Sequence, residues 1–154
     1  MTGELDRIDR RILQHLQRDG RMTNSDLAQA VHVSAATCHR RTQRLFDEGY
    51  VRAVRAEITP GKVDRGTLVV VGVVLDRSTP ESFAAFEAAI RVLPAVLDCH
   101  LVAGDFDYFL KLRVRDIADF NRLHGEQLIA LPGVRQTRTF FVMKEVVDNG
   151  PLAF

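Results

Sequence analysis

The sequence predicts an α+β protein with two small domains, the first helical and the second alternating strands with helices. Two observations lead to this fold class. Helix patterns with capping residues follow one another before residue 50, and after residue 66 apolar runs of strand length alternate with amphipathic runs of helix length. The 154 residues, 46% of them hydrophobic, suffice for two small cores.

Three helices are expected in the first domain. The first covers residues 5–19 and ends at Gly20. Its apolar stripe consists of Leu5, Ile8, Ile12 and Leu16. Thr23 with Asp26, and then Ser34, can cap two more helices, because their side-chain oxygens can accept from the free N–H groups of a first turn. These two helices together predict a helix-turn-helix.

After Gly49, which can end the third helix, a short β-wing is expected to complete a winged helix-turn-helix domain over residues 1–59. The apolar positions of this wing are Tyr50, Val51, Val54 and Ile58, with Arg52 and Arg55 outside. The breaker Thr59-Pro60-Gly61 follows, so residues 60–66 are expected to form a hinge.

The second domain, residues 67–154, contains a repeat. Strand, helix and strand occur twice, and each helix ends in an LPxV corner, at Leu93 and again 38 residues later at Leu131. The expected strands cover residues 67–75, 96–103, 108–114 and 134–147, and the expected helices are residues 80–93 and the one capped by Asp116. This is the βαββαβ order of a ferredoxin-like sandwich.

Both faces of the expected sheet are apolar. In the run from Thr67 to Leu75 both the odd- and the even-numbered positions are apolar. On the last strand, Phe140 and Phe141 point to opposite faces. Two helices can cover only one face of a four-stranded sheet. A second subunit is the simplest cover for the other, because an exposed apolar face of this size usually marks an interaction surface.

The third helix is the candidate for binding nucleic acid. Between Ser34 and Phe46 it carries three arginines and no acid, and Cys38, Thr42 and Leu45 are spaced to face the core. The residues expected at the DNA are Ser34, Ala35, Ala36, Thr37, His39, Arg40, Gln43 and Arg44. Arg41 is expected to brace the backbone or the protein itself. The alternative is a solvated charged helix face without a partner.

The net charge of +1 is low for a DNA-binding protein, but its distribution is uneven. Residues 1–58 hold ten basic and eight acidic side chains, and the remainder holds eleven and twelve. Few phosphate contacts per subunit give weak binding, so tight binding is expected to need more than one copy.

A second candidate site is the segment Gly104-Asp105-Phe106-Asp107, a turn between two strands. Its two carboxylates can bind a ligand's ammonium group, and Gly104 lets backbone amides approach a carboxylate. Thr137 and Thr139 on the last strand can supply hydroxyls. A plain Asp-rich β-turn is the alternative.

Catalytic and targeting signals are sparse. The five histidines form no HxxxH pair, and the sequence lacks a GxSxG elbow and a phosphate-binding glycine loop. Cys38 and Cys99 lack metal-ligand spacing. No apolar run can span a bilayer, and the charged N-terminus does not fit a secretory signal, so a cytoplasmic protein that is not an enzyme is expected.

The segments LDRIDRRIL, LQRDGRMTN, CHLVAGDFDYFLK and LPGVRQTRTFFVMKEV resemble the Lrp/AsnC, or feast/famine, transcription regulators. The resemblance implies a DNA-binding domain followed by a domain that senses a small amino acid and forms homodimers, which assemble into tetramers or octamers. It implies that the effector binds where dimers meet, with Asp107 tied to the response. The implied effector residues are Ala103, Gly104, Asp105, Phe106, Asp107, Thr137, Thr139 and Phe141. No cofactor is implied.

Two rival functions remain. Sirohaem decarboxylases resemble these regulators in size and element order, and such an enzyme needs cationic and imidazole groups around a tetrapyrrole. His100, His124 and Arg113 are the candidates for those groups. The other rival is an assembly module that senses a ligand without touching DNA.

Overall fold

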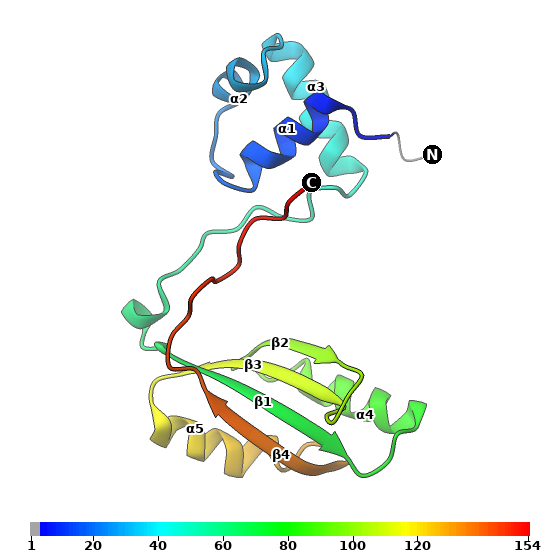
Figure 1. Ribbon diagram of the computed structural model, residues 1–154, viewed down its shortest axis with the longest axis vertical. Helices are drawn as coiled ribbons and strands as arrows, with labels where there is room; N and C mark the ends of the chain where they lie inside the picture. Colours follow the sequence, from blue (N-terminus) through cyan, green and yellow to red (C-terminus); the bar gives the residue numbers. More distant parts are fainter. Residues whose placement is uncertain (1–3) are drawn as a thin grey trace. The chain divides into compact units, whose positions relative to one another are not determined.

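The computed structural model describes residues 4–154 and divides the chain into two compact units (Figure 1). One unit is helical and consists of residues up to Glu57 together with Val147–Phe154. The other, Ile58–Val146, holds the sheet. The sequence placed the final residues with the sheet, whereas the structure groups them with the helices.

The helical unit contains α1 (Arg7–Leu16), α2 (Asn24–Val31) and α3 (Ala35–Asp47). Both caps of the helix-turn-helix form as expected: Thr23 Oγ1 accepts from the backbone N–H of the third residue after it at 3.1 Å, and Ser34 Oγ does the same at 3.2 Å. The two caps thus fix where α2 and α3 begin on either side of the turn that joins them.

The helical unit has its own core. Ile12 of α1, Leu27 and Val31 of α2, and Cys38 and Leu45 of α3 are all at most 2% exposed. The helical spacing in the sequence therefore predicted the buried side of α1 and of α3. Cys38 is one of these buried residues, which fits a small apolar packing role.

The first helix is shorter than expected. Asp6 caps it, so it starts at Arg7, and it ends at Leu16 instead of Asp19. Residues after Leu16 form a turn, in which the Asp19 carboxylate accepts from the backbone N–H of Arg21 at 2.9 Å. Gly20 therefore lies beyond the helix and does not end it.

The expected β-wing is wrong. From Val51 to Thr59 the chain contains no strand, and Val54 and Ile58 are 52% and 60% exposed. A strand needs a hydrogen-bonded neighbour, and the described part of the helical unit contains no other strand to supply one. The pattern of apolar residues predicted a strand, but the described residues of a single chain offer no strand beside it to complete the wing.

The sheet consists of β1 (Thr67–Leu75), β2 (Val96–Leu101), β3 (Tyr108–Val114) and β4 (Val134–Phe141), in the order β2-β3-β1-β4 with antiparallel neighbours. This is the order that a ferredoxin-like βαββαβ sandwich requires, so the predicted α+β fold class is confirmed. The second and fourth strands end earlier than expected.

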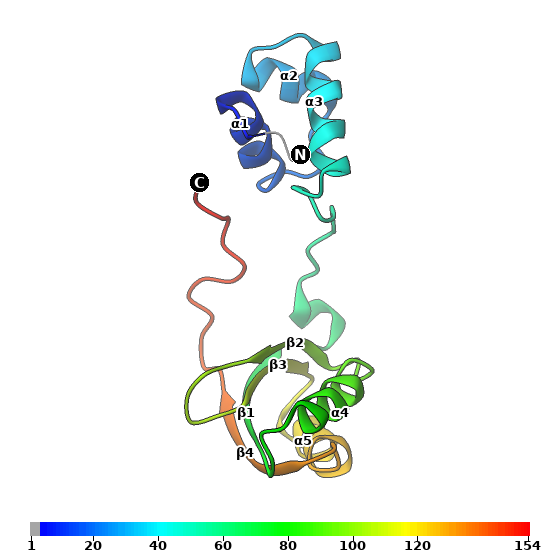
Figure 2. The same ribbon diagram turned by 90° about the vertical axis from the view of Figure 1, so that its right-hand side faces the viewer.

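Two helices cover the sheet on one side, α4 (Pro80–Ile90) and α5 (Ile117–Leu123), which is followed by a π-helical turn, η2 (His124–Leu128) (Figure 2). A 3-10 turn, η1 (Pro60–Val63), precedes β1. The helix α4 ends at Ile90, three residues before the expected end at Leu93, where the LPxV corner begins. Both corners form the same turn, with backbone N–H to carbonyl distances of 3.1 and 3.3 Å.

The main core lies between the sheet and these helices. The odd-numbered residues of β1 point into it, as do the even-numbered residues of β3. The ring of Tyr108 lies in this core, with its centroid 4.6 Å from that of Phe86.

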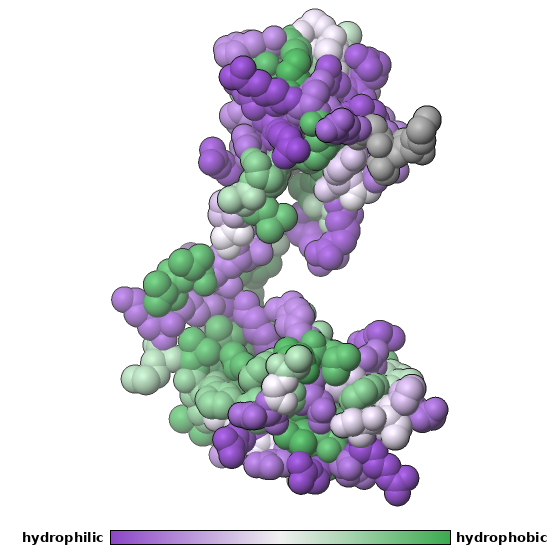
Figure 3. Space-filling view, turned by 45° about the vertical axis from the view of Figure 1, so that its right-hand side comes forward, coloured by the Kyte–Doolittle hydropathy of each residue, from purple (hydrophilic) through white to green (hydrophobic). Residues whose placement is uncertain are grey.

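The open face of the sheet is partly covered by the chain itself. The ring of Phe106 lies over Gly72, where an added Cβ would come within 2.6 Å of the ring. Phe106 also packs on Phe109, and Arg138 lies over the Phe106 ring. Apolar surface nevertheless remains on the sheet unit, as Figure 3 shows, and Phe140 is 48% exposed.

Candidate nucleic-acid interface and effector site

The solvent-facing side of α3 carries most of the residues expected at DNA. Ser34, Ala35, Ala36, His39, Arg40 and Gln43 are exposed, whereas Thr37 is half-buried and its hydroxyl bonds Ser34 at 2.9 Å. Small side chains at the start of α3 leave its first turn open to close approach. Arg40 is exposed one turn later, so this side suits a groove lined by acceptors and phosphates.

Arg44 differs from the expectation that it acts only at DNA. Its guanidinium lies 2.6 Å from the carboxylate of Asp9 on α1, and Asp9 is only 1% exposed. Arg41 pairs with the same carboxylate at 2.9 Å and with Asp6 at 2.7 Å. The bracing role predicted for Arg41 is confirmed, and Arg44 shares it.

This network of Asp6, Asp9, Arg41 and Arg44 fixes α3 against the start of α1. The Asp6 carboxylate accepts from the backbone N–H of Asp9 and from Arg41, and these bonds lower the pKa of Asp6 to about 2. Asp6 therefore stays charged at any physiological pH. Sequence reasoning missed Asp9, although it lies one helical turn after Leu5 on the apolar side of α1, where an acid signals a buried partner.

In the candidate effector loop, Asp107 holds the end of β1. Its carboxylate accepts from the backbone N–H of Leu75 at 2.7 Å, and its own N–H donates to Val73 at 2.9 Å. Ala103, Gly104 and Asp105 are exposed. The segment is therefore a turn in which the carboxylate of Asp107 is half-buried and that of Asp105 is exposed to solvent.

The other expected effector residues lie on β4, beside the opposite edge of β1. Thr137 pairs in register with Val73, so it lies one strand away from the point where Asp107 bonds. Its hydroxyl bonds His124 Nε2 at 2.8 Å. Asp107 and Thr137 thus flank the same end of β1.

Not all expected effector residues gather there. Thr139 and Phe141 pair with Val71 and Val69, progressively farther along β1, and the Phe141 ring packs on Phe120 at 5.3 Å. Phe106 covers the open face of the sheet instead. Within one chain the set is spread along β1 and over both faces.

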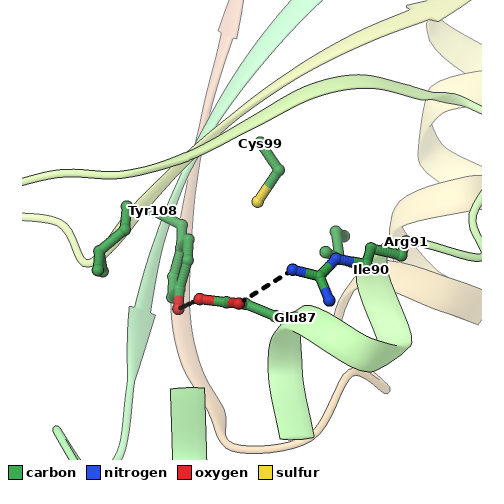
Figure 4. Close-up of a pocket in the computed structure, with 6 residues that line it drawn as sticks. Glu87, Ile90, Arg91, Cys99 and Tyr108 are labelled. Atoms are coloured by element: carbon green, nitrogen blue, oxygen red, sulfur yellow. Dashed lines mark hydrogen bonds and ion pairs between the residues drawn. The ribbon is translucent and has the colours of Figure 1, made fainter. Parts of the chain in front are cut away.

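A separate pocket of about 250 Å³ lies between α4 and the edge strand β2 (Figure 4). In it the Tyr108 hydroxyl donates to Glu87 at 2.9 Å, and Arg91 lies 3.4 Å from the same carboxylate. Burial, followed by the nearby Glu87, raises the pKa of the Cys99 thiol, and the same causes raise that of Tyr108. Both groups therefore stay protonated at neutral pH and are poor nucleophiles.

The groups considered for a tetrapyrrole enzyme are not brought together. His124 bonds Thr137 beside α5, His100 lies exposed on β2, and Arg113 pairs with Glu145 at 2.5 Å. Among the described residues no cluster of His, Cys, Asp and Glu could hold a metal ion. None of the helices in residues 4–154 is long and apolar enough to cross a membrane.

Comparison with known proteins gives two family matches that cover most of the chain. Residues 5–45 match the AsnC-type helix-turn-helix domain, and residues 68–152 match the Lrp/AsnC ligand binding domain. The chain is 44% identical to the leucine-responsive regulatory protein of Salmonella typhimurium over 149 residues, which are 97% of this chain and 91% of that protein.

Solved structures agree in fold. A transcriptional regulator from Neisseria meningitidis, solved as a complex with L-Met, has a TM-score of 0.93 and 33% identity over 97% of both chains. An AsnC family transcriptional regulator from Agrobacterium tumefaciens has a TM-score of 0.92 and 30% identity, also over 97% of both chains.

Proposed function

The chain belongs to the Lrp/AsnC family of DNA-binding transcriptional regulators, and from that premise we propose which of its residues read DNA and sense the amino acid. The proposal rests on the exposed side of α3, which presents His39, Arg40 and Gln43 to solvent. Residues 35–44 of this helix include no acidic side chain. We infer that this side enters the major groove, with the first turn of α3 closest to the bases.

Amino-acid sensing is proposed to depend on the turn at residues 103–107 and on the two threonines of β4. The turn offers the carboxylates of Asp105 and Asp107, and Thr137 offers a hydroxyl at the same end of β1. Since the set is spread out within one chain, the complete site is proposed to form where two dimers meet. The effector is a small amino acid.

We propose that the protein works in the cytoplasm as a homodimer that assembles further into tetramers or octamers. The dimer is proposed to bury the open face of the sheet, around Val70 and Phe140, which are paired in register. Two α3 helices in such a dimer would address half-sites about 34 Å apart, one turn of DNA.

Phe140→Glu tests the packing of this face. The side chain is 48% exposed in the single chain, so a charge there is tolerated by the fold but is buried at the proposed interface. Sedimentation of the full chain should show dissociation. Val92→Glu, at a 75% exposed position after α4, should leave assembly unchanged. Equal sedimentation of both variants and the wild type would refute the sheet-face dimer.

Genome-wide footprinting of the full-length protein, with and without L-leucine or L-methionine, tests the proposed function. Protected sites with a palindromic trend that change with an amino acid are expected. A protein that protects no DNA would be an assembly module. A tetrapyrrole absorbance band in the purified protein would instead favour the enzyme, although no grouping of side chains supports it.

A further inference from the structure

The residues that follow β4 are docked on the first helix of the DNA-binding unit. The side-chain amide of Gln17 both donates to the carbonyl of Leu152 at 2.8 Å and accepts from its N–H at 3.0 Å. Gln14 donates to the carbonyl of Phe154 at 2.7 Å. Gln14 in the last turn of α1 and Gln17, its C-cap, therefore bind the backbone of residues 152–154, much as a neighbouring strand would.

The segment approaches this face through a shaped turn. Asn149 has a φ of +44°, in the left-handed region, and Pro151 directly precedes Leu152. The proline fixes its own φ and favours an extended residue before it, so the docked backbone is partly preorganised. We call residues 147–154 the strap.

The other end of the strap is fixed to the sheet unit. Val142 donates its backbone N–H to Leu68 at 3.0 Å, and Glu145 pairs with Arg113, which is only 9% exposed. Glu145 thus anchors the chain two residues before the strap begins. It follows β4, the strand that carries Thr137 and Thr139.

We propose that the strap is a second, releasable tether between the effector-sensing unit and the DNA-binding unit. The first connection is the chain near Ile58. With the strap docked, the DNA-binding unit is restrained at two points, and this lowers the entropy lost when two subunits engage paired half-sites. Only three hydrogen bonds, at partly exposed positions, hold the strap on Gln14 and Gln17, so the strap can be released.

The docking step is tested without DNA or effector. In the full chain, hydrogen exchange of the peptide covering the strap should be slowed about tenfold relative to an unstructured peptide. Gln14→Ala combined with Gln17→Ala should abolish this protection. Gln29→Ala, the same change on an exposed position of α2, should preserve it. Unprotected exchange in the wild type, or protection that survives the double substitution, would show that Gln14 and Gln17 do not hold the strap.

The tether role rests on the proposed DNA binding and has its own readout. In the double variant, affinity for a footprinted pair of half-sites should fall about threefold or more. Deletion of residues 148–154 should lower it by the same factor. A protein that carries both the double substitution and the deletion should show no further loss. A single half-site should be bound equally by all. Protected exchange with unchanged paired-site affinity would refute the tether, whereas loss of all DNA binding by the wild type would refute the proposed function.

Discussion

Asp9→Ala is expected to destabilise the helical unit by about 3 kcal/mol, because the substitution leaves Arg41 and Arg44 without their shared buried partner. The value lies at the low end for a broken buried ion pair, since Arg44 is 35% exposed and can regain some solvent. The free energy can be measured by hydrogen exchange of α1, α2 and α3 amides in the full chain as urea is raised.

Two variants separate the charge from the packing in this experiment. Asp9→Asn keeps the shape and one acceptor oxygen, so it should lose part of the stability but less than the alanine variant. Glu4→Ala removes a carboxylate from an exposed position near the same helix and should have almost no effect. An Asp9→Ala protein as stable as the wild type would mean that Arg41 and Arg44 do not brace α3.

Asp107→Asn is expected to weaken effector binding by about one to two orders of magnitude, the loss typical of a charge-assisted contact worth roughly 1.5–3 kcal/mol. The asparagine amide keeps an oxygen that can accept from the N–H of Leu75, so the fold and ligand-free DNA binding should persist. Calorimetry with whichever of L-leucine and L-methionine binds the wild type measures the effect.

Two comparisons decide what Asp107 does. Asp98→Asn removes the same charge from an exposed position of β2, outside the proposed effector residues, and should change affinity by less than about fivefold, as for a solvated charge. Asp107→Ala should in addition lower stability by about 1–3 kcal/mol, because the Leu75 amide loses its partner. If Asp107→Asn binds effector like the wild type, the segment is only a turn.

Local signals in the sequence predicted the local structure well. The caps at Thr23, Ser34 and Asp116 form as expected, because each depends on hydrogen bonds to residues only three positions away. The apolar run of β1 and the two LPxV corners also predicted the βαββαβ element order, and short connections leave few strand orders compatible with it.

Features that join distant positions could not be predicted in the same way. Arg44 and Asp9 are 35 residues apart, and Gln17 and Leu152 are 135 apart. Neither pair leaves a periodic signal in one sequence. The cover of Gly72 by Phe106 was missed for the same reason, so the sequence overestimated how much of the sheet a second subunit must bury.

The most direct test of the central claim, that the exposed side of α3 reads DNA, is the affinity of Arg40→Ala for a footprinted site. Arg40 is exposed and has no role in the Asp9 network, so its loss should leave folding intact and cost about 1–3 kcal/mol of binding. Arg77→Ala, which removes one exposed positive charge from the sheet unit, should bind like the wild type. Unchanged affinity for Arg40→Ala would contradict the assignment of α3 as the recognition helix.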